Sequence, residues 1–236
     1  MPWIDEVPAL VHSWYLGNST GEAIADVLFG KVNPSAKLSL TFPKRLEDTP
    51  SYGHMGSENG SVWYAENLFV VRTFALSVRP ILTFPQGYKH YVHKAIPTLF
   101  PFGYGLSYST FEFSNLEVSQ PSGPEHTFAA KVKVQNTGSV VGSEVVQIYV
   151  SPSSTTKLTH PTYALRGFAK AKDVQPGKSV ELEVALDKYA LSYWCDVRNH
   201  WKIEKGTYKV MVGVSAEKMV LTSEIEVKKE CYWNGL

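Results

Sequence analysis

The sequence predicts a mainly β protein, with an antiparallel β-sandwich in its C-terminal half. An incomplete α/β strand–helix unit and a long irregular connector precede this sandwich. From about Phe111 onward, apolar and polar residues alternate with period 2 in short segments separated by turn residues. This pattern is typical of sandwich strands. Before that point, only one stretch has helical periodicity.

The first element expected is a strand–helix unit over residues 8–30, a short apolar strand followed by a helix. Glu22 suits the positive N-terminal end of that helix, and Gly30 stops it. The residues that can cap the helix are Asn18, Ser19 and Thr20, and its apolar face is formed by Ala23, Ile24, Val27 and Leu28. A single unit of this kind leaves its strand unpaired and its helix face exposed, so it implies missing neighbours.

Residues 30–61 are rich in Pro, Gly, Ser and Asn and are predicted to be loop, with one possible strand from Lys37 to Phe42. The sandwich strands follow. They are expected at about 111–119, 128–134, 146–150, 163–171, 180–186, 208–214 and 220–227. The Cys…Trp…Cys pattern of antibody domains is absent from the sequence, so a fibronectin type III-like (Ig-like) sandwich describes it better.

Composition excludes several classes of partner. Lys and Arg number 23 against 22 Asp and Glu, and the basic residues are scattered, so no nucleic acid partner is expected. The apolar runs are too short to span a membrane, and the N-terminus lacks the layout of a signal peptide.

Cys195 and Cys231 are too few for a disulfide framework and are expected to be free structural thiols.

The stretch LFPFGYGLSY, residues 99–108, has neither helical nor strand periodicity. Pro101 blocks ladder pairing, and Gly103 and Gly105 allow unusual backbone angles. Four aromatic residues can pack between two domains there, namely Phe100, Phe102, Tyr104 and Tyr108. An aromatic loop that covers one end of the sandwich is the alternative interpretation.

Several stretches together resemble the C-terminal part of a fungal β-glucosidase of glycoside hydrolase family 3. They are WYLGNSTGEAIADVLFGKVNPSAKL, LTFPKRLEDTPSY, WYAENLFV, GYKHYVHKAIPTLFPFGYGLSYSTFEFSNL and VQNTGSVVGSEVVQIYVSP. In that family a barrel precedes an α/β sandwich domain, and a fibronectin-like domain follows. The resemblance implies four parts: residues 1–50 as a remnant of the α/β sandwich domain, 51–110 as a connector, 111–230 as the fibronectin type III-like domain, and 231–236 as a tail.

The resemblance also implies that the parent enzyme hydrolyses terminal non-reducing β-D-glucosyl residues. Its Asp nucleophile would lie on a barrel strand and its Glu acid/base on a sandwich loop, both upstream of Met1. Retaining glycosidases need two carboxyl groups about 5–5.5 Å apart, and Glu47, Asp48 and Glu66 are weak candidates because they lie in loop or connector. We therefore expect no catalytic, cofactor-binding or metal-ligating residue in this chain, no cofactor, and no activity of the chain alone.

Other interpretations of the sequence remain open. A stand-alone fibronectin-like module for binding or scaffolding is one alternative. Another is assembly with a separately encoded barrel half, the β-glucoside being a substrate of the parent enzyme only. The compartment is not predicted, although the parent family is often secreted. In that case Asn18 and Asn59, each in an Asn-x-Ser/Thr sequon, would be possible glycosylation sites.

Residues 71–86 interrupt the family pattern, because deleting them joins YAENLFV directly to GYKHYV. Their 16 residues correspond to 48 nucleotides, a Val codon begins with GT, and the Gln codon CAG ends with AG. We hypothesise a retained intron, with a genuine insertion as the alternative. A spliced transcript that still carries these nucleotides would reject the intron.

Two further groups are weak site candidates. His90 and His93 could suggest a metal site, but on an extended chain a spacing of three places them on opposite faces, which favours surface histidines. Trp63, Tyr64, Trp194 and Trp201 could form a platform for sugar rings. The structural alternative places Trp63 and Tyr64 at the domain junction, and Trp194 and Trp201 in the core or at the end of the sandwich.

Overall fold

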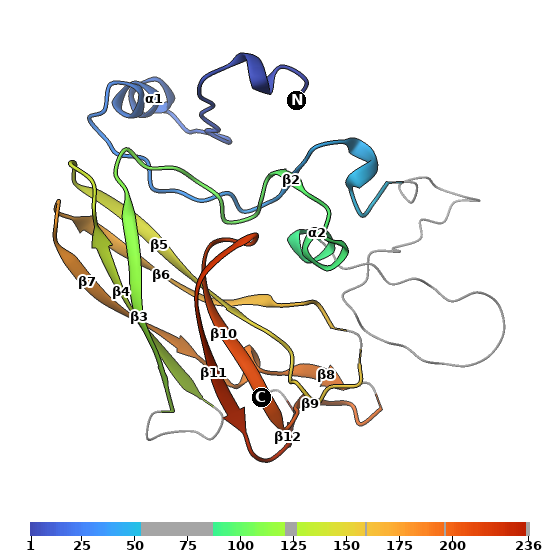
Figure 1. Ribbon diagram of the computed structural model, residues 1–236. Helices are drawn as coiled ribbons and strands as arrows, with labels where there is room; N and C mark the ends of the chain where they lie inside the picture. The colour runs from blue at the N-terminus through green and yellow to red at the C-terminus, as the bar shows by residue number, and fades with distance from the viewer. Residues whose placement is uncertain (53–86, 121–126, 159, 196, 235–236) are drawn as a thin grey trace.

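The computed structural model describes residues 1–52, 87–120, 127–158, 160–195 and 197–234 (Figure 1). Two antiparallel sheets form the sandwich. One sheet has the order β3-β4-β7 and consists of Phe111–Ser119, Phe128–Asn136 and Ser179–Leu186. The other has the order β11-β10-β5-β6 and consists of Lys218–Val227, Gly206–Ser215, Gly142–Val150 and Ala164–Val174. The seven predicted strands and the mainly β fold are thus confirmed.

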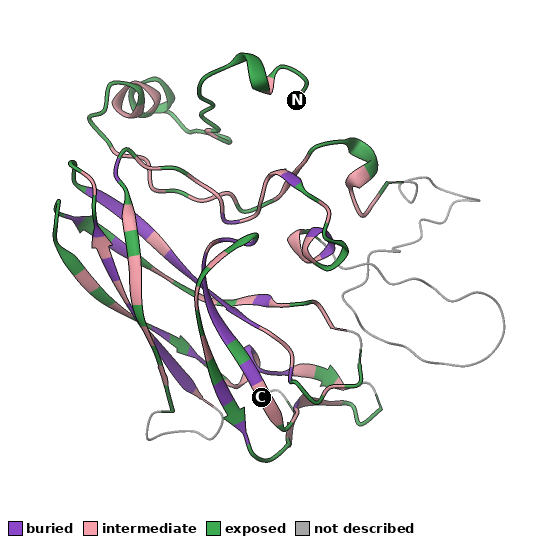
Figure 2. Cartoon of the chain, in the orientation of Figure 1, coloured by how far each residue is buried: buried purple, intermediate pink, exposed green. Residues whose placement is uncertain are grey.

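The core of the sandwich consists of the apolar residues that the period-2 pattern turns inward. On β4 the side chains of Ala130, Val132 and Val134 are fully buried, and Val132 lies opposite Leu182 of β7. On the facing sheet Val210 of β10 lies opposite Val150 of β5. Figure 2 shows that buried residues are concentrated in these strands. Removing this apolar surface from water supplies the main driving force for folding.

Strand β5 is buried on both faces, which the alternation does not predict. The alternation with Val146, Ile148 and Val150 places Gln147 and Tyr149 on the outward face, yet they are 3% and 0% exposed. Tyr88, Phe102 and Tyr163 pack over this outer face. The hydroxyl of Tyr149 donates to Oε1 of Gln147 at 2.8 Å, so the buried polar atoms are paired there.

A small three-stranded sheet lies at one end of the sandwich. It consists of β8 (Tyr193–Cys195), β9 (His200–Ile203) and β12 (Cys231–Trp233), in the order β12-β9-β8. The sequence did not predict these strands, because three or four residues are too few to show a period, and β12 falls in the stretch interpreted as a tail. Cys195 and Cys231 are free, on opposite sides of β9. Two strand spacings of about 4.8 Å separate β8 from β12, more than a disulfide spans.

The N-terminal half is less regular than the predicted strand–helix unit. Helix α1 (Thr20–Leu28) forms as expected and ends before Gly30, which has φ +74°. Ser19 occupies the N-cap position but its side chain makes no capping hydrogen bond. The strand predicted before the helix is absent from residues 8–19, because no neighbouring strand lies in the described chain to pair with it.

The predicted strand from Lys37 to Phe42 is also wrong in extent. Only β1 (Phe42–Pro43) forms, and it pairs with β2 (Thr98–Phe100). Short helices complete the chain: η1 (Ile4–Glu6), η2 (Leu46–Asp48), α2 (Tyr88–Lys94) and η3 (Lys188–Ala190). None of the described helices has the length and apolar character needed to cross a bilayer.

Candidate functional site

Residues 99–108 run beside residues 36–43, between α1 and the sandwich (Figure 1). The amide of Gly103 donates to the carbonyl of Leu38, and the amide of Leu38 donates to the carbonyl of Tyr104, both at 2.8 Å. Gly103 has φ +79°, as expected from its backbone freedom. Gly105 is needed for a different reason from the one predicted. Its φ is ordinary, but a Cβ there would collide with the carbonyl oxygen of Ala36.

The four aromatic residues of this stretch contact different parts of the molecule. Phe102 stacks on Tyr88 with ring centroids 4.7 Å apart and packs on the outer face of β5. The hydroxyl of Tyr108 donates to the carbonyl of Val27 in α1 at 2.8 Å. Phe100 and Tyr104 stack on each other at 5.6 Å. Phe100 also meets Phe42 of β1 edge to face.

Polar side chains add a second set of contacts across this junction. Asn33 donates through Nδ2 to the carbonyl of Val141, while its Oδ1 accepts from Ser107 Oγ and from the amide of Tyr108. Lys37 pairs with Glu144 of β5 at 2.7 Å, with both side chains nearly buried. The predicted junction residues Trp63 and Tyr64 lie outside the described residues, as do Glu66, Asn59 and residues 71–86.

The histidine expectation rested on an extended chain, and that premise is wrong. His90 and His93 lie in α2, where His90 is buried and His93 is exposed. Burial lowers the pKa of His90, and the positive charge of Lys94 adds to this effect. Among the described residues no group of three or more His, Cys, Asp and Glu side chains is arranged to hold a metal ion.

A cavity of about 240 Å³ is lined by Glu47, Asp48 and His90, among others. Asp48 forms an ion pair with Arg45 at 2.8 Å. The hydrogen bond from Arg45 lowers the pKa of the Asp48 carboxyl. A general acid of a glycosidase needs the opposite shift, a raised pKa. The Asp48 carboxyl is therefore not prepared for that role.

A second cavity, of about 270 Å³, lies where the small sheet meets the sandwich. We call it the sandwich-end cavity. Its aromatic wall is formed by Tyr193, Trp194, Trp201 and Tyr208, and its polar lining includes Lys89, His160, Arg166, Ser192 and Glu204. Trp194 and Trp201 meet edge to face at 5.8 Å, and Trp194 is 36% exposed. The two tryptophans therefore lie at the end of the sandwich and outside its core.

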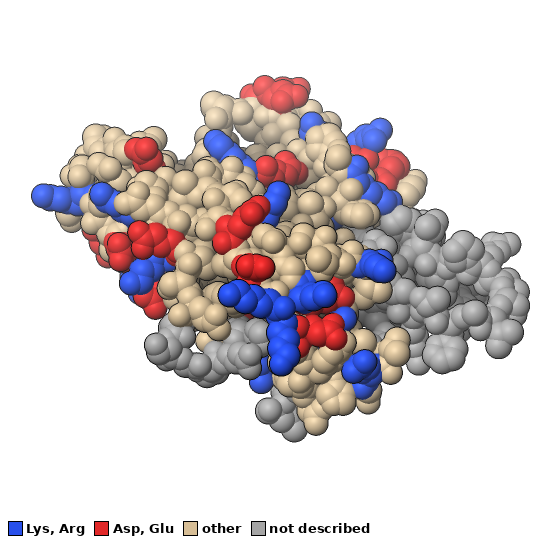
Figure 3. Space-filling model, turned by 60° about the horizontal axis from the view of Figure 1, so that its bottom comes forward, with Lys and Arg blue, Asp and Glu red and all other residues tan. Residues whose placement is uncertain are grey.

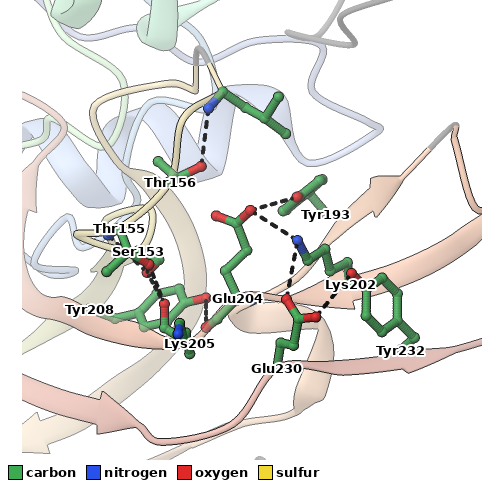
Figure 4. Close-up of polar contacts among 11 residues, drawn as sticks. Ser153, Thr155, Thr156, Tyr193, Lys202, Glu204, Lys205, Tyr208, Glu230 and Tyr232 are labelled. Atoms are coloured by element: carbon green, nitrogen blue, oxygen red, sulfur yellow. Dashed lines mark hydrogen bonds and ion pairs between the residues drawn. The ribbon is translucent and has the colours of Figure 1, made fainter.

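Glu204 is held in place by a network of polar contacts (Figure 4). Its Oε1 accepts from the hydroxyl of Tyr193 at 2.9 Å and from Nζ of Lys202 at 3.3 Å. Burial opposes ionisation of Glu204, but hydrogen bonds from Thr156, Tyr193 and Lys202 outweigh it and lower its pKa. Lys202 also lies 3.5 Å from Glu230. Glu204 is thus an ionised carboxylate whose position is fixed.

The sandwich-end cavity lacks the pair of acids that glycoside cleavage requires. Glu204 is the only carboxylate among the described residues that line it. The cavity nevertheless has the features of a small-molecule binding site, since it combines ring surfaces with convergent polar groups. Apart from the two tryptophans, sequence reasoning missed this site, because its residues come from α2, β6 and the segments around β8 and β9 and share no motif.

The charged residues on one face of the molecule are of mixed sign (Figure 3). Figure 3 shows Lys and Arg interspersed with Asp and Glu over the face that it presents. Asn18 is exposed, as a glycosylation site must be.

Two protein-family models match the sequence. The glycosyl hydrolase family 3 C-terminal domain matches residues 1–108, and the fibronectin type III-like domain matches residues 144–216. Among curated proteins, the chain is 40% identical over 237 residues to a probable β-glucosidase K and 43% identical over 244 residues to a probable β-glucosidase I, both from Emericella nidulans. Both alignments cover 100% of this chain, but only 25% and 27% of those proteins.

Solved structures give the same result. A β-glucosidase from Kluyveromyces marxianus superposes with a TM-score of 0.85 at 38% identity, covering 100% of this chain and 26% of that one. β-Glucosidase 3B from Thermotoga neapolitana superposes with a TM-score of 0.84 at 31% identity, covering 98% and 30%. The chain thus spans about a quarter of the length of the curated relatives that it matches.

Proposed function

The chain belongs to glycosyl hydrolase family 3, and from that premise we propose that it is a non-catalytic part of a β-glucosidase, in which it buttresses the catalytic portion. Residues 1–52 supply the observation that carries this proposal. None of these residues is buried (Figure 2). Of the 22 large apolar side chains that are exposed in the described chain, 13 belong to residues 1–52. An apolar surface of this extent indicates an interaction site.

The catalytic portion of the enzyme is the occupant we propose for that surface. Trp14, Tyr15, Leu28 and Phe29 are exposed around α1, with Tyr15 fully accessible and Phe29 88% exposed. In an α/β domain such side chains pack against neighbouring strands and helices. The contacts of residues 99–108 with α1 and with the sandwich would then hold the catalytic portion in a fixed position relative to the sandwich.

The reaction of the whole enzyme is part of the same proposal. We infer hydrolysis of a terminal β-D-glucosyl residue through a glycosyl-enzyme intermediate, with an Asp nucleophile and a Glu acid/base in the portion that this chain lacks. The relatives bear the name β-glucosidase, which supports the substrate class.

The purified chain is expected to show no turnover of an aryl β-glucoside above the uncatalysed background, since no described cavity holds a carboxyl pair suited to cleavage. Release of the aryl alcohol measures this directly. A recombinant full-length relative serves as the positive control for the assay. Turnover by the chain that survives repurification and is abolished by mutating a carboxylate of this chain would reject the proposed non-catalytic role.

Limited proteolysis is expected to remove residues 1–52 first and to leave a resistant product that begins between residues 87 and 111 and ends near residue 233. The first segment buries no residue, whereas the sandwich strands are closely packed. Mass spectrometry of timed digests identifies the products. Equal resistance of residues 1–52 in the monomer would instead favour a stand-alone module.

The stand-alone module remains the second candidate, because the sandwich has a complete core of its own. A separately encoded catalytic portion is the third possibility. Co-purification of the tagged chain from its source organism distinguishes it, since a stoichiometric barrel protein is expected only if two chains assemble.

A further inference from the structure

The sandwich-end cavity contains two cations without an acidic partner among the described residues that line it. Lys89, half-buried in α2, and Arg166, exposed on β6, both contribute to the lining. Neither forms an ion pair in the described chain, although the negative charge of Asp187 acts on Arg166. The carboxylate of Glu204 is occupied by Tyr193 and by Lys202, a lysine that does not line the cavity.

The guanidinium of Arg166 has most of its donors available. An arginine carries five N–H donors in a planar fork that fits a carboxylate. In the described chain its hydrogen bond is a long one, from Nη1 to the carbonyl of Tyr189 at 3.4 Å. Burial lowers the pKa of Lys89, and the positive charge of Arg166 contributes to the same shift. An anion between the two cations would offset their mutual repulsion.

Ser192 supplies an independent indication of a ligand. It lines the cavity and is 3% exposed, and its Oγ has no hydrogen-bond partner in the described chain. An unsatisfied buried hydroxyl costs about 1–3 kcal/mol, so such groups are rare in native proteins. A ligand oxygen in the cavity would satisfy it.

The wall and the volume of the cavity restrict the ligand further. Trp194 and Trp201 offer ring surfaces beside the polar groups. The volume of the cavity is about 270 Å³. That space suits a single six-membered ring with its substituents.

We propose that the sandwich-end cavity binds a six-membered ring that carries a carboxylate. The carboxylate lies between Lys89 and Arg166. The ring lies against Trp194 and Trp201, and the Ser192 hydroxyl forms a hydrogen bond with a ligand oxygen. Two sources supply this chemistry, a sugar acid and an aromatic acid. This site is an addition to the buttressing role and does not depend on the activity of the whole enzyme.

Isothermal titration of the full chain tests this proposal with four probes. Glucuronate is compared with glucose, and 4-hydroxybenzoate is compared with 4-hydroxybenzyl alcohol, so each acid has a neutral analogue. At least one acid is expected to bind about tenfold or more tightly than its analogue. The acid that binds more tightly identifies the source. Equal binding of acid and analogue, or no binding of either acid at millimolar concentration, would overturn the proposal.

Variants then locate the site. Lys89→Met and Arg166→Met are each expected to weaken binding of the preferred acid by about tenfold or more, since each removes one charge-assisted contact. Lys172→Met is the matched control, because Lys172 is exposed on β6 and does not line the cavity. Thermal melting monitors the fold, and Ser192→Ala provides a variant with little volume change. Equal weakening by Lys172→Met, or unchanged binding in all three cavity variants, would place the ligand elsewhere and reject the assignment.

Discussion

Replacing Asn136 with alanine is expected to lower the free energy of unfolding of the sandwich by about 3–5 kcal/mol. The Asn136 side chain is completely buried at the end of β4. Its Oδ1 accepts from Ser109 Oγ at 2.6 Å and from the amide of Gly138 at 2.9 Å. Its Nδ2 donates to the carbonyls of Val140 and Val174 at 2.8 and 2.7 Å. Alanine leaves several of these groups buried without a partner.

Urea denaturation followed by circular dichroism measures this loss. Thr137→Ala is the neighbouring control, since Thr137 is exposed and its hydroxyl contacts only Thr110 among the hydrogen bonds of the described side chains. The control is expected to cost less than about 1 kcal/mol. Asn136→Asp keeps the shape but points a carboxylate oxygen at two carbonyl oxygens, so it should be at least as damaging as alanine. A loss for Asn136→Ala no larger than that of the control would contradict this account.

The fold could be predicted from the sequence where a local residue pattern is compatible with only one conformation. Val132 and Val134 alternate with Lys131 and Lys133, and a strand is the conformation that separates these two sets onto opposite faces. Each of the seven strands of the sandwich has enough residues to show this alternation. The stop at Gly30 is local in the same way, because a left-handed residue ends the helix whatever surrounds it.

The remainder could not be predicted because it depends on contacts between distant segments. Tyr149 is buried because Tyr88 and Phe102 of the connector pack over it. The sequence near Tyr149 does not indicate that these distant residues contact it. The strand expected before α1 fails for the converse reason. Its apolar residues would form a strand only beside partner strands that the described chain does not supply.

The candidate site illustrates the same limit. Trp194 and Trp201 were noticed as aromatic residues, but Lys89, Arg166 and Ser192 carry no signal of their own in the sequence. They become a site only when α2, β6 and the turn before β8 converge around one cavity. The composition of the chain gives only the total charge, which is balanced. It does not show that two cations lie close together in the sandwich-end cavity.

Replacing Lys37 with methionine is expected to destabilise the junction between the N-terminal segment and the sandwich by about 3–5 kcal/mol, the usual cost of breaking a buried ion pair from one side. Nζ of Lys37 lies 2.7 Å from Glu144, and these side chains are 11% and 9% exposed. The same Nζ donates to the carbonyl of Gly105 at 2.7 Å. Without Lys37, the Glu144 carboxylate keeps the amide of Val145 but has lost its cation.

The matched control is Lys31→Met, which removes an ion pair with Asp26 in which the Lys31 side chain is 70% exposed. A surface pair of this kind contributes about 0–1 kcal/mol. Hydrogen exchange of the amides in residues 99–108 reports on the junction separately from global unfolding. The double variant Lys37→Met/Glu144→Leu should recover most of the loss, because it leaves no buried charge without a partner. Should the double variant exchange as fast as Lys37→Met alone, the unpaired carboxylate is not the cause. The junction would then depend on the stacking of Phe102 and on the hydrogen bond of Tyr108.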